Sequence, residues 1–238
     1  SADGEYITAG SNDDIVYLFD KDSSTPLWTY DVGTHGVVEL AMSADGEYIA
    51  AAGGSNDKVF LWDKDSSTPL WSYSTGSYYV TDVGISADGE YIIAGTNDDT
   101  VYLFDKDSST PLWNYTFSIE DVSSEVYSLG MSADGEYIAA TSENDKLYLF
   151  DKDSGTPLWS FSGDSHWGTA IAISADGEYI VAGGRPNDKK IYLFDKSLTD
   201  DEPLWEYSTS ASYIHRLEIS ADGSTIATQI FSNSEQII

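Results

Sequence analysis

The chain has 238 residues, no cysteine, 11 basic and 41 acidic residues, and a formal net charge of −30. With 41% hydrophobic and 13% aromatic residues it can bury a core, which separates it from disordered acidic tails. Few basic residues argue against binding to nucleic-acid phosphates or anionic membranes. The lack of cysteine excludes disulfides, thiolate metal sites and a cysteine nucleophile. Such acidity suits an extracellular or cell-surface protein, or alternatively the cytoplasm of a high-salt organism.

A tetrapeptide, Ser-Ala-Asp-Gly, recurs along the whole chain at spacings of 42 to 46 residues. Its copies begin at Ser1, Ser43, Ser86, Ser132, Ser174 and Ser220. A tryptophan ends a Pro-Leu-Trp segment between successive copies, at Trp28, Trp71, Trp113, Trp159 and Trp205. Because the extra residues of longer copies fall between these markers, the pattern indicates a repeat architecture.

The copy around Ser86 predicts four short strands, at residues 80–86, 90–95, 100–105 and 112–115. Asp-Gly and Asn-Asp pairs between the apolar runs are hairpin signals, since these residues tolerate a positive φ. No segment shows a sustained helical period, so no helix is predicted. A four-stranded antiparallel unit of about 40–45 residues is typical of a propeller blade.

The repeated stretch GEYIAAGSNDDxVYLFDKDSSTPLW resembles the PQQ-like repeat, and its SADGEYIAAG part equally resembles the turn of WD40-like repeats. In the PQQ-like family an aspartate closes the third strand and a tryptophan follows eight positions later, which is the spacing of Asp20 to Trp28 and of Asp63 to Trp71. The resemblance implies an all-β β-propeller domain over residues 1–238. We expect six blades, the last incomplete; five blades, or part of a larger ring, are the alternatives.

The resemblance also implies that the repeated tryptophans dock between adjacent blades. An aromatic binding surface is the alternative, but identity in every repeat favours a shared packing role. Quinoprotein dehydrogenases of the resembled family use larger rings, a calcium-held cofactor and, in some, adjacent cysteines. This chain has no cysteine and fewer blades, so we expect neither PQQ nor another cofactor.

Paired aspartates in the turn before each tryptophan resemble the opening of a calcium-binding loop. The clearest pairs are Asp20 with Asp22, Asp63 with Asp65, and Asp105 with Asp107. A calcium loop also needs a later bidentate carboxylate, and Thr-Pro-Leu-Trp follows here instead. We interpret these runs as turns held by aspartate side chains, with structural calcium as the alternative.

The repeats differ at the position four residues before each Ser-Ala-Asp-Gly serine. That position holds Glu39, Asp82, Ser128, Ala170 and Arg216. Variation within a constant frame is where a repeat protein places function. Together with Glu218, the charged members predict a ligand site at the mouth of the central channel; a solvated ion cluster is the alternative.

Loop aromatics give a second candidate surface. Tyr78, Tyr79 and Trp167 fall on connections between blades and are predicted to form a partner-binding face. No nucleophile elbow, phosphate loop or HExxH motif is present. We therefore predict a non-catalytic scaffold for an unknown protein partner, with an enzymatic or small-ligand propeller as the alternative.

Overall fold

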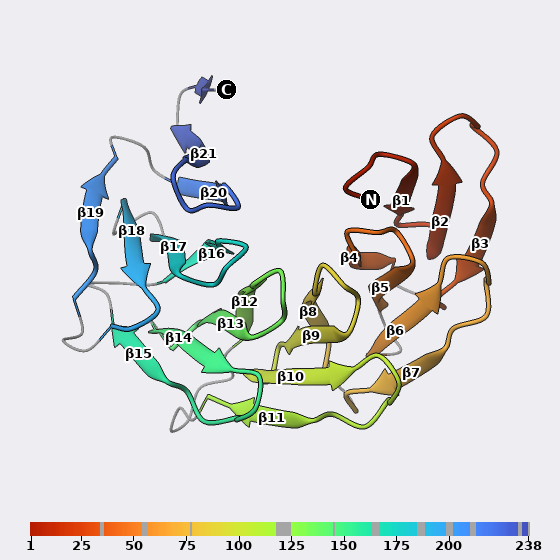
Figure 1. Cartoon of the computed structure of the whole chain (residues 1–238), viewed down its shortest axis with the longest axis horizontal. Helices are drawn as coiled ribbons and strands as arrows, with labels where there is room; N and C mark the ends of the chain where they lie inside the picture. Colours follow the sequence, from red (N-terminus) through yellow and green to blue (C-terminus); the bar gives the residue numbers. More distant parts are fainter. Residues whose placement is uncertain are drawn as a thin grey trace. The chain divides into compact units, whose positions relative to one another are not determined.

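The computed structural model describes residues 1–33, 36–53, 57–76, 78–117, 125–144, 146–162, 167–184, 189–198, 202–209, 213–232 and 235–237. Six antiparallel sheets make up this described part, and no helix occurs in it (Figure 1). Consequently none of the described residues belongs to a helix that could cross a membrane. The chain divides into two compact units, Ser1–Thr116 and Phe117–Ile238.

The first unit contains three consecutive sheets, one of three strands and two of four. The first sheet has the order β1 (Tyr6–Gly10), β2 (Ile15–Asp20), β3 (Trp28–Asp31). The second has β4 (Val37–Met42), β5 (Tyr48–Gly53), β6 (Lys58–Asp63) and β7 (Trp71–Ser74). The third has β8 (Val80–Ile85), β9 (Tyr91–Thr96), β10 (Thr100–Asp105) and β11 (Trp113–Thr116).

The second unit repeats the same plan and ends on a shorter sheet. Its first sheet has β12 (Val126–Met131), β13 (Tyr137–Ser142), β14 (Lys146–Asp151) and β15 (Trp159–Ser162). The next has β16 (Trp167–Ile173), β17 (Tyr179–Gly184), β18 (Lys190–Asp195) and β19 (Trp205–Ser208). The last has β20 (Tyr213–Ile219), β21 (Ile226–Ser232) and β22 (Glu235–Ile237).

The Ser-Ala-Asp-Gly segment is a side-chain-locked turn between the first two strands of a sheet. The Ser43 hydroxyl donates to the Asp45 carboxylate (2.6 Å) and accepts from the Tyr48 N–H (3.0 Å). Gly46 has a φ of 75°, a left-handed conformation that glycine adopts without a steric cost. The same contacts recur in the other copies, so the tetrapeptide recurs because it sets the hairpin.

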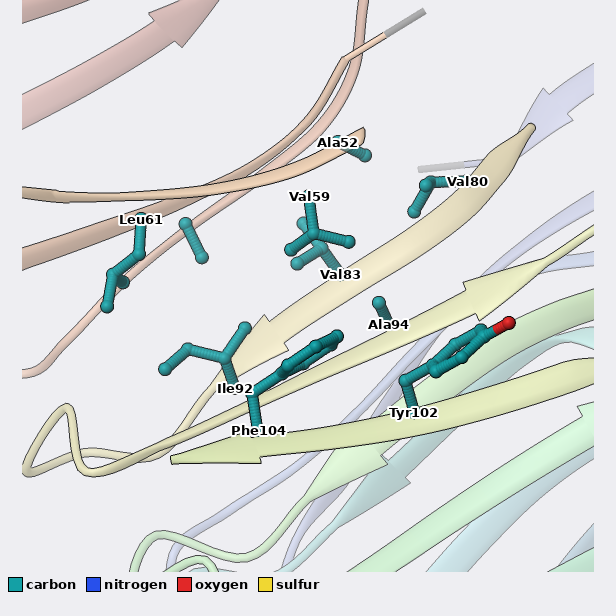
Figure 2. Packing of buried hydrophobic residues seen from close by; sticks show 10 residues of the cluster. Ala52, Val59, Leu61, Val80, Val83, Ile92, Ala94, Tyr102 and Phe104 are labelled. Carbon is teal, nitrogen blue, oxygen red and sulfur yellow. The ribbon is translucent and has the colours of Figure 1, made fainter. Parts of the chain in front are cut away.

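The core of each unit lies between successive sheets. In the cluster shown in Figure 2, Ala52 and Leu61 of the second sheet pack against Val83, Ala94 and Phe104 of the third. The middle strands carry alanine and glycine because both of their faces are covered, and β5 and β9 are buried along almost their whole length. Full burial of a large apolar side chain such as Leu61 or Phe104 stabilises the fold by about 1.5–3 kcal/mol.

Backbone contacts also join the inner turns of neighbouring sheets. The Ala2 N–H donates to the Ala44 carbonyl, and the Ala44 N–H donates to the Ala87 carbonyl, both at 2.8 Å. In the second unit Ala133 and Ala175 donate in the same way, at 3.0 and 3.1 Å. Within each unit, successive sheets are thus tied together by main chain as well as by side chains.

The prediction of an all-β fold of repeated antiparallel blades is confirmed. Six sheets, four of them four-stranded and the last short, match the predicted six blades with an incomplete last one. The strand bounds of the copy around Ser86 agree with the prediction to within one residue. The single domain over residues 1–238 stays a prediction, since the chain divides into two compact units.

Candidate functional site

The repeated tryptophan bridges two successive sheets at Trp28, Trp71 and Trp159. The Trp71 indole N–H donates to the Lys106 carbonyl (2.7 Å), and its ring lies 5.3 Å from that of Phe104. Trp28 makes the same pair of contacts with Lys64 and Trp62, and Trp159 makes them with Lys196 and Phe194. Trp113 is half-buried at the start of β11. Trp28, Trp71 and Trp159 therefore each join their own sheet to the next one.

The lysine whose carbonyl accepts the tryptophan N–H also uses its side chain at the junction between the two sheets. Lys64 Nζ lies 3.0 Å from Asp65, 3.3 Å from Glu47, and 5.9 Å from the ring centroid of Tyr6 in the preceding sheet. The Asp65 carboxylate, and to a lesser extent the Glu47 carboxylate, raises the pKa of Lys64 above its usual value. The sequence analysis did not identify this role, although a lysine recurs at this position in five repeats and could have indicated it.

The paired aspartates form turns of the kind predicted from their spacing. Asp20, Asp63 and Asp105 each accept a 2.8 Å hydrogen bond from the backbone N–H two residues on. The second member of each pair, Asp22, Asp65 or Asp107, is bonded to the lysine between the two aspartates. Within the described ranges no group of three or more acidic or histidine side chains is arranged to hold a metal ion.

The variable position on the first strand of each sheet follows a β-bulge. Val37 pairs with Gly53 and Glu39 with Ala52, so one extra residue stands between them on β4. The same register shift precedes Asp82 on β8 and Arg216 on β20. A bulge turns the following side chain away from the regular pleat and is common beside binding sites. Sequence reasoning missed it because an extra residue is defined only against its partner strand.

The charged first-strand residues lie in both units. Glu39 is exposed, whereas Asp82 is half-buried and accepts a 2.8 Å hydrogen bond from the Val83 N–H. Arg216 and Glu218 are both exposed on β20. The predicted convergence of these four side chains spans the two units and stays a prediction.

Within the first unit, Glu39 borders an open hollow of about 190 Å³. Val37, Val38 and Leu40 of β4 line it, together with Gly10 at the end of β1. Gly10 is required there, because a Cβ atom on it would lie 2.6 Å from a methyl carbon of Val37. More polar than apolar surface faces the hollow, and Glu39 places a carboxylate at its border.

Two adjacent tyrosines project from the connection between β7 and β8. Tyr78 is 46% exposed and Tyr79 is 51% exposed. Their backbone is anchored: the Thr75 hydroxyl donates to the Tyr78 carbonyl (2.7 Å), and the Asn97 N–H donates to the Tyr79 carbonyl (3.0 Å). The third residue of the predicted face, Trp167, begins β16, and its side chain lies outside the described part.

Trp205 has a different environment from the other repeated tryptophans. Its side chain is 41% exposed, and Tyr207 two residues on is 63% exposed. No described group accepts a hydrogen bond from its indole N–H. In the described part of the chain, Trp205 makes no inter-blade contact like those of Trp28, Trp71 and Trp159, in keeping with the predicted incomplete last blade.

Comparison with known families gives two matching segments, residues 12–129 and 121–236, both to the family described as outer membrane protein assembly factor BamB. A search of the curated proteins found no match. The two segments cover almost the whole chain and contain the repeated sheets described above. The chain therefore belongs to this PQQ-like repeat family, a family of β-propeller proteins.

Proposed function

We propose that this protein is a non-catalytic β-propeller scaffold that binds a protein partner outside the cell or at its surface. The anchored tyrosine pair, Tyr78 and Tyr79, carries the proposal. Tyrosine supplies a large amphipathic contact area with few rotatable bonds, so little conformational entropy is lost on binding. Both tyrosine carbonyls are already held by the fold, which lowers the ordering cost further.

Two further facts support this function. The Ser-Ala-Asp-Gly serines and aspartates hold turns, and the lysines that follow the third strands are paired with carboxylates. The family description names an assembly factor of the outer membrane, a role exercised on other proteins. The acidic surface suits a partner with a basic or neutral contact surface, because like charges would repel.

Photo-cross-linking tests the proposal directly. A photoreactive phenylalanine analogue is placed at Tyr79 and, as a control, at Ser72, which is exposed on β7 of the same sheet. In the native source, the Tyr79 probe should capture a discrete protein that the Ser72 probe does not capture. Excess wild-type chain should compete for it, whereas the double variant Tyr78→Ala/Tyr79→Ala should not. Equal capture from both positions, or none, would refute a partner surface at this loop.

A small-ligand function has one observation in its favour, the hollow beside Glu39. A carboxylate at the border of a largely polar hollow suits a small amine. A panel of alkyl and aryl amines can be screened by the shift they cause in melting temperature. This candidate requires a shift that is lost in Glu39→Gln and kept in Glu218→Gln, whose carboxylate lies in the other unit.

A further inference from the structure

The outer strand of the third sheet carries a three-residue modification motif. Asn114, Tyr115 and Thr116 of β11 form an Asn-x-Thr triplet whose middle residue is not proline, and no other Asn-x-Ser or Asn-x-Thr triplet occurs in the sequence. Such a triplet is the acceptor motif for N-linked glycans in exported proteins. Because the attached oligosaccharide is bulky and hydrophilic, the asparagine has to lie at the surface of the fold.

Asn114 is separate from the asparagines that belong to the repeat pattern. Five of the seven asparagines precede an aspartate in the repeated Asn-Asp pair, whereas Asn114 lies between a tryptophan and a tyrosine. Since three other residue types serve at the same repeat position, the strand does not need an asparagine there to form. The residues at this position in the other copies are Thr29, Ser72, Ser160 and Glu206.

The place of β11 in its sheet brings the Asn114 side chain to the surface. β11 is the outer strand of the third sheet, with β10 as its neighbour (Figure 1). Along the strand, the half-buried rings of Trp113 and Tyr115 alternate with two exposed polar residues. These exposed residues are Asn114 and Thr116. Within the described ranges, no group is hydrogen-bonded to the Asn114 amide, so the fold does not use it.

The two groups that define the motif lie on one side of the strand. Residues i and i+2 of an extended segment project to the same side. The Thr116 hydroxyl marks this side, because it lies 3.0 Å from the hydroxyl of Thr100 on β10. A transferase that approaches β11 from this side meets the Asn114 amide and the Thr116 hydroxyl together.

A glycan at this position also suits an outer strand. An exposed strand edge is a template for pairing with another chain, and charged side chains are one common protection against it. Residues 108–119 contain no charged residue, although 22% of the whole chain is charged. A hydrophilic oligosaccharide beside β11 occupies the space that another strand would need.

We propose that Asn114 carries an N-linked oligosaccharide, transferred from a lipid-phosphate-linked donor. In the transfer, Asn114 Nδ2 bonds to the anomeric carbon of the first sugar and loses one proton. The bond from that carbon to the phosphate oxygen breaks, and the phosphate keeps the electron pair. The inference rests on the location outside the cell proposed above, because this motif is modified in exported chains.

Mass spectrometry of the chain purified from its native source tests the site. Fragmentation of the tryptic peptide of residues 107–146 should place a sugar mass on Asn114. Asn114→Gln and Thr116→Ala should remove the sugar, whereas Thr116→Ser keeps the hydroxyl and should keep the sugar. Asn12→Gln is the control, because Asn12 is exposed but has Asp14 two residues on. The exposed positions of these changes should leave the melting temperature within a few degrees of the parent chain.

The equivalent strand β7 supplies a gain-of-site variant. Ser72 is exposed at the repeat position of Asn114 and is followed by Tyr73 and Ser74, so Ser72→Asn completes the motif there and should add a second glycan. A sugar on the Ser72→Asn strand with Asn114 unmodified, or a sugar retained in Asn114→Gln, would overturn the proposal. Unmodified Asn114 in protein recovered from outside the cell would also overturn it and leave the scaffold function intact. Unmodified protein found only inside the cell would overturn both.

Discussion

Replacing Trp71 by alanine tests whether the repeated tryptophan holds successive blades together. Its indole ring packs 5.3 Å from Phe104, and its N–H donates to the Lys106 carbonyl at 2.7 Å. Trp71→Ala removes both contacts at once. It also leaves the Lys106 carbonyl without this donor at a partly buried position.

The expected cost follows from the burial of the ring. Truncating a fully buried large aromatic costs about 3–5 kcal/mol. Since Trp71 is half-buried, we expect a loss of about 3 kcal/mol in the free energy of unfolding, at the lower end of that range. Trp71→Phe keeps most of the ring and removes only the hydrogen bond, so it should cost about 1 kcal/mol.

The chain supplies a matched control at the same repeat position. Trp205 is 41% exposed and lacks both contacts in the described part of the chain, so Trp205→Ala should cost under about 1 kcal/mol. Chemical denaturation monitored by circular dichroism measures all three variants against the parent chain. If Trp71→Ala and Trp205→Ala cost the same, the contacts of Trp71 with Phe104 and Lys106 do not stabilise the fold and the reasoning fails.

Three further predictions concern turns and charge. Gly89→Ala should destabilise the fold by about 1–3 kcal/mol more than Gly4→Ala. Both glycines have a φ near 75°, but only at Gly89 would a Cβ atom clash with a side chain, the Tyr48 ring. Thermal melts of the two variants measure the difference. The Ser220 hydroxyl, with other donors, lowers the pKa of Asp222 to about 2, so its stabilising contribution should be complete above about pH 4 and lost as pH falls toward 2. NMR titration of the carboxyl should show Ser220→Ala moving that pKa upward. Added salt should raise the melting temperature by screening the net charge of −30; a flat response would contradict self-repulsion.

The strands were predictable because each repeat carries the same local pattern of apolar runs and turn residues. The turn glycines and the alternating aromatics around Ser86 predict β8 to β11 to within one residue. The packing role of Trp28 and Trp71 followed from their recurrence. The first inference uses a single copy of the repeat, and the second uses the comparison of its copies.

Features that depend on the neighbouring strand or sheet were not predictable. The bulge before Glu39 exists only relative to the register of β5, and one sequence does not show that register. The indole N–H of Trp62 is buried with no acceptor among the described residues, at a position where four other repeats carry phenylalanine.

Identity and environment together separate structure from function in this chain. Where a residue repeats and its contacts repeat, as for Trp28, Trp71 and Trp159, the role is structural. Where the residue changes on a constant backbone, as at Glu39, the position is free to acquire a ligand. The third case is a residue that repeats while its contacts do not. Trp205 has the residue type of an inter-blade contact without that contact in the described part of the chain. Recurrence alone therefore does not establish a structural role, and the environment of each copy has to be compared before a role is assigned.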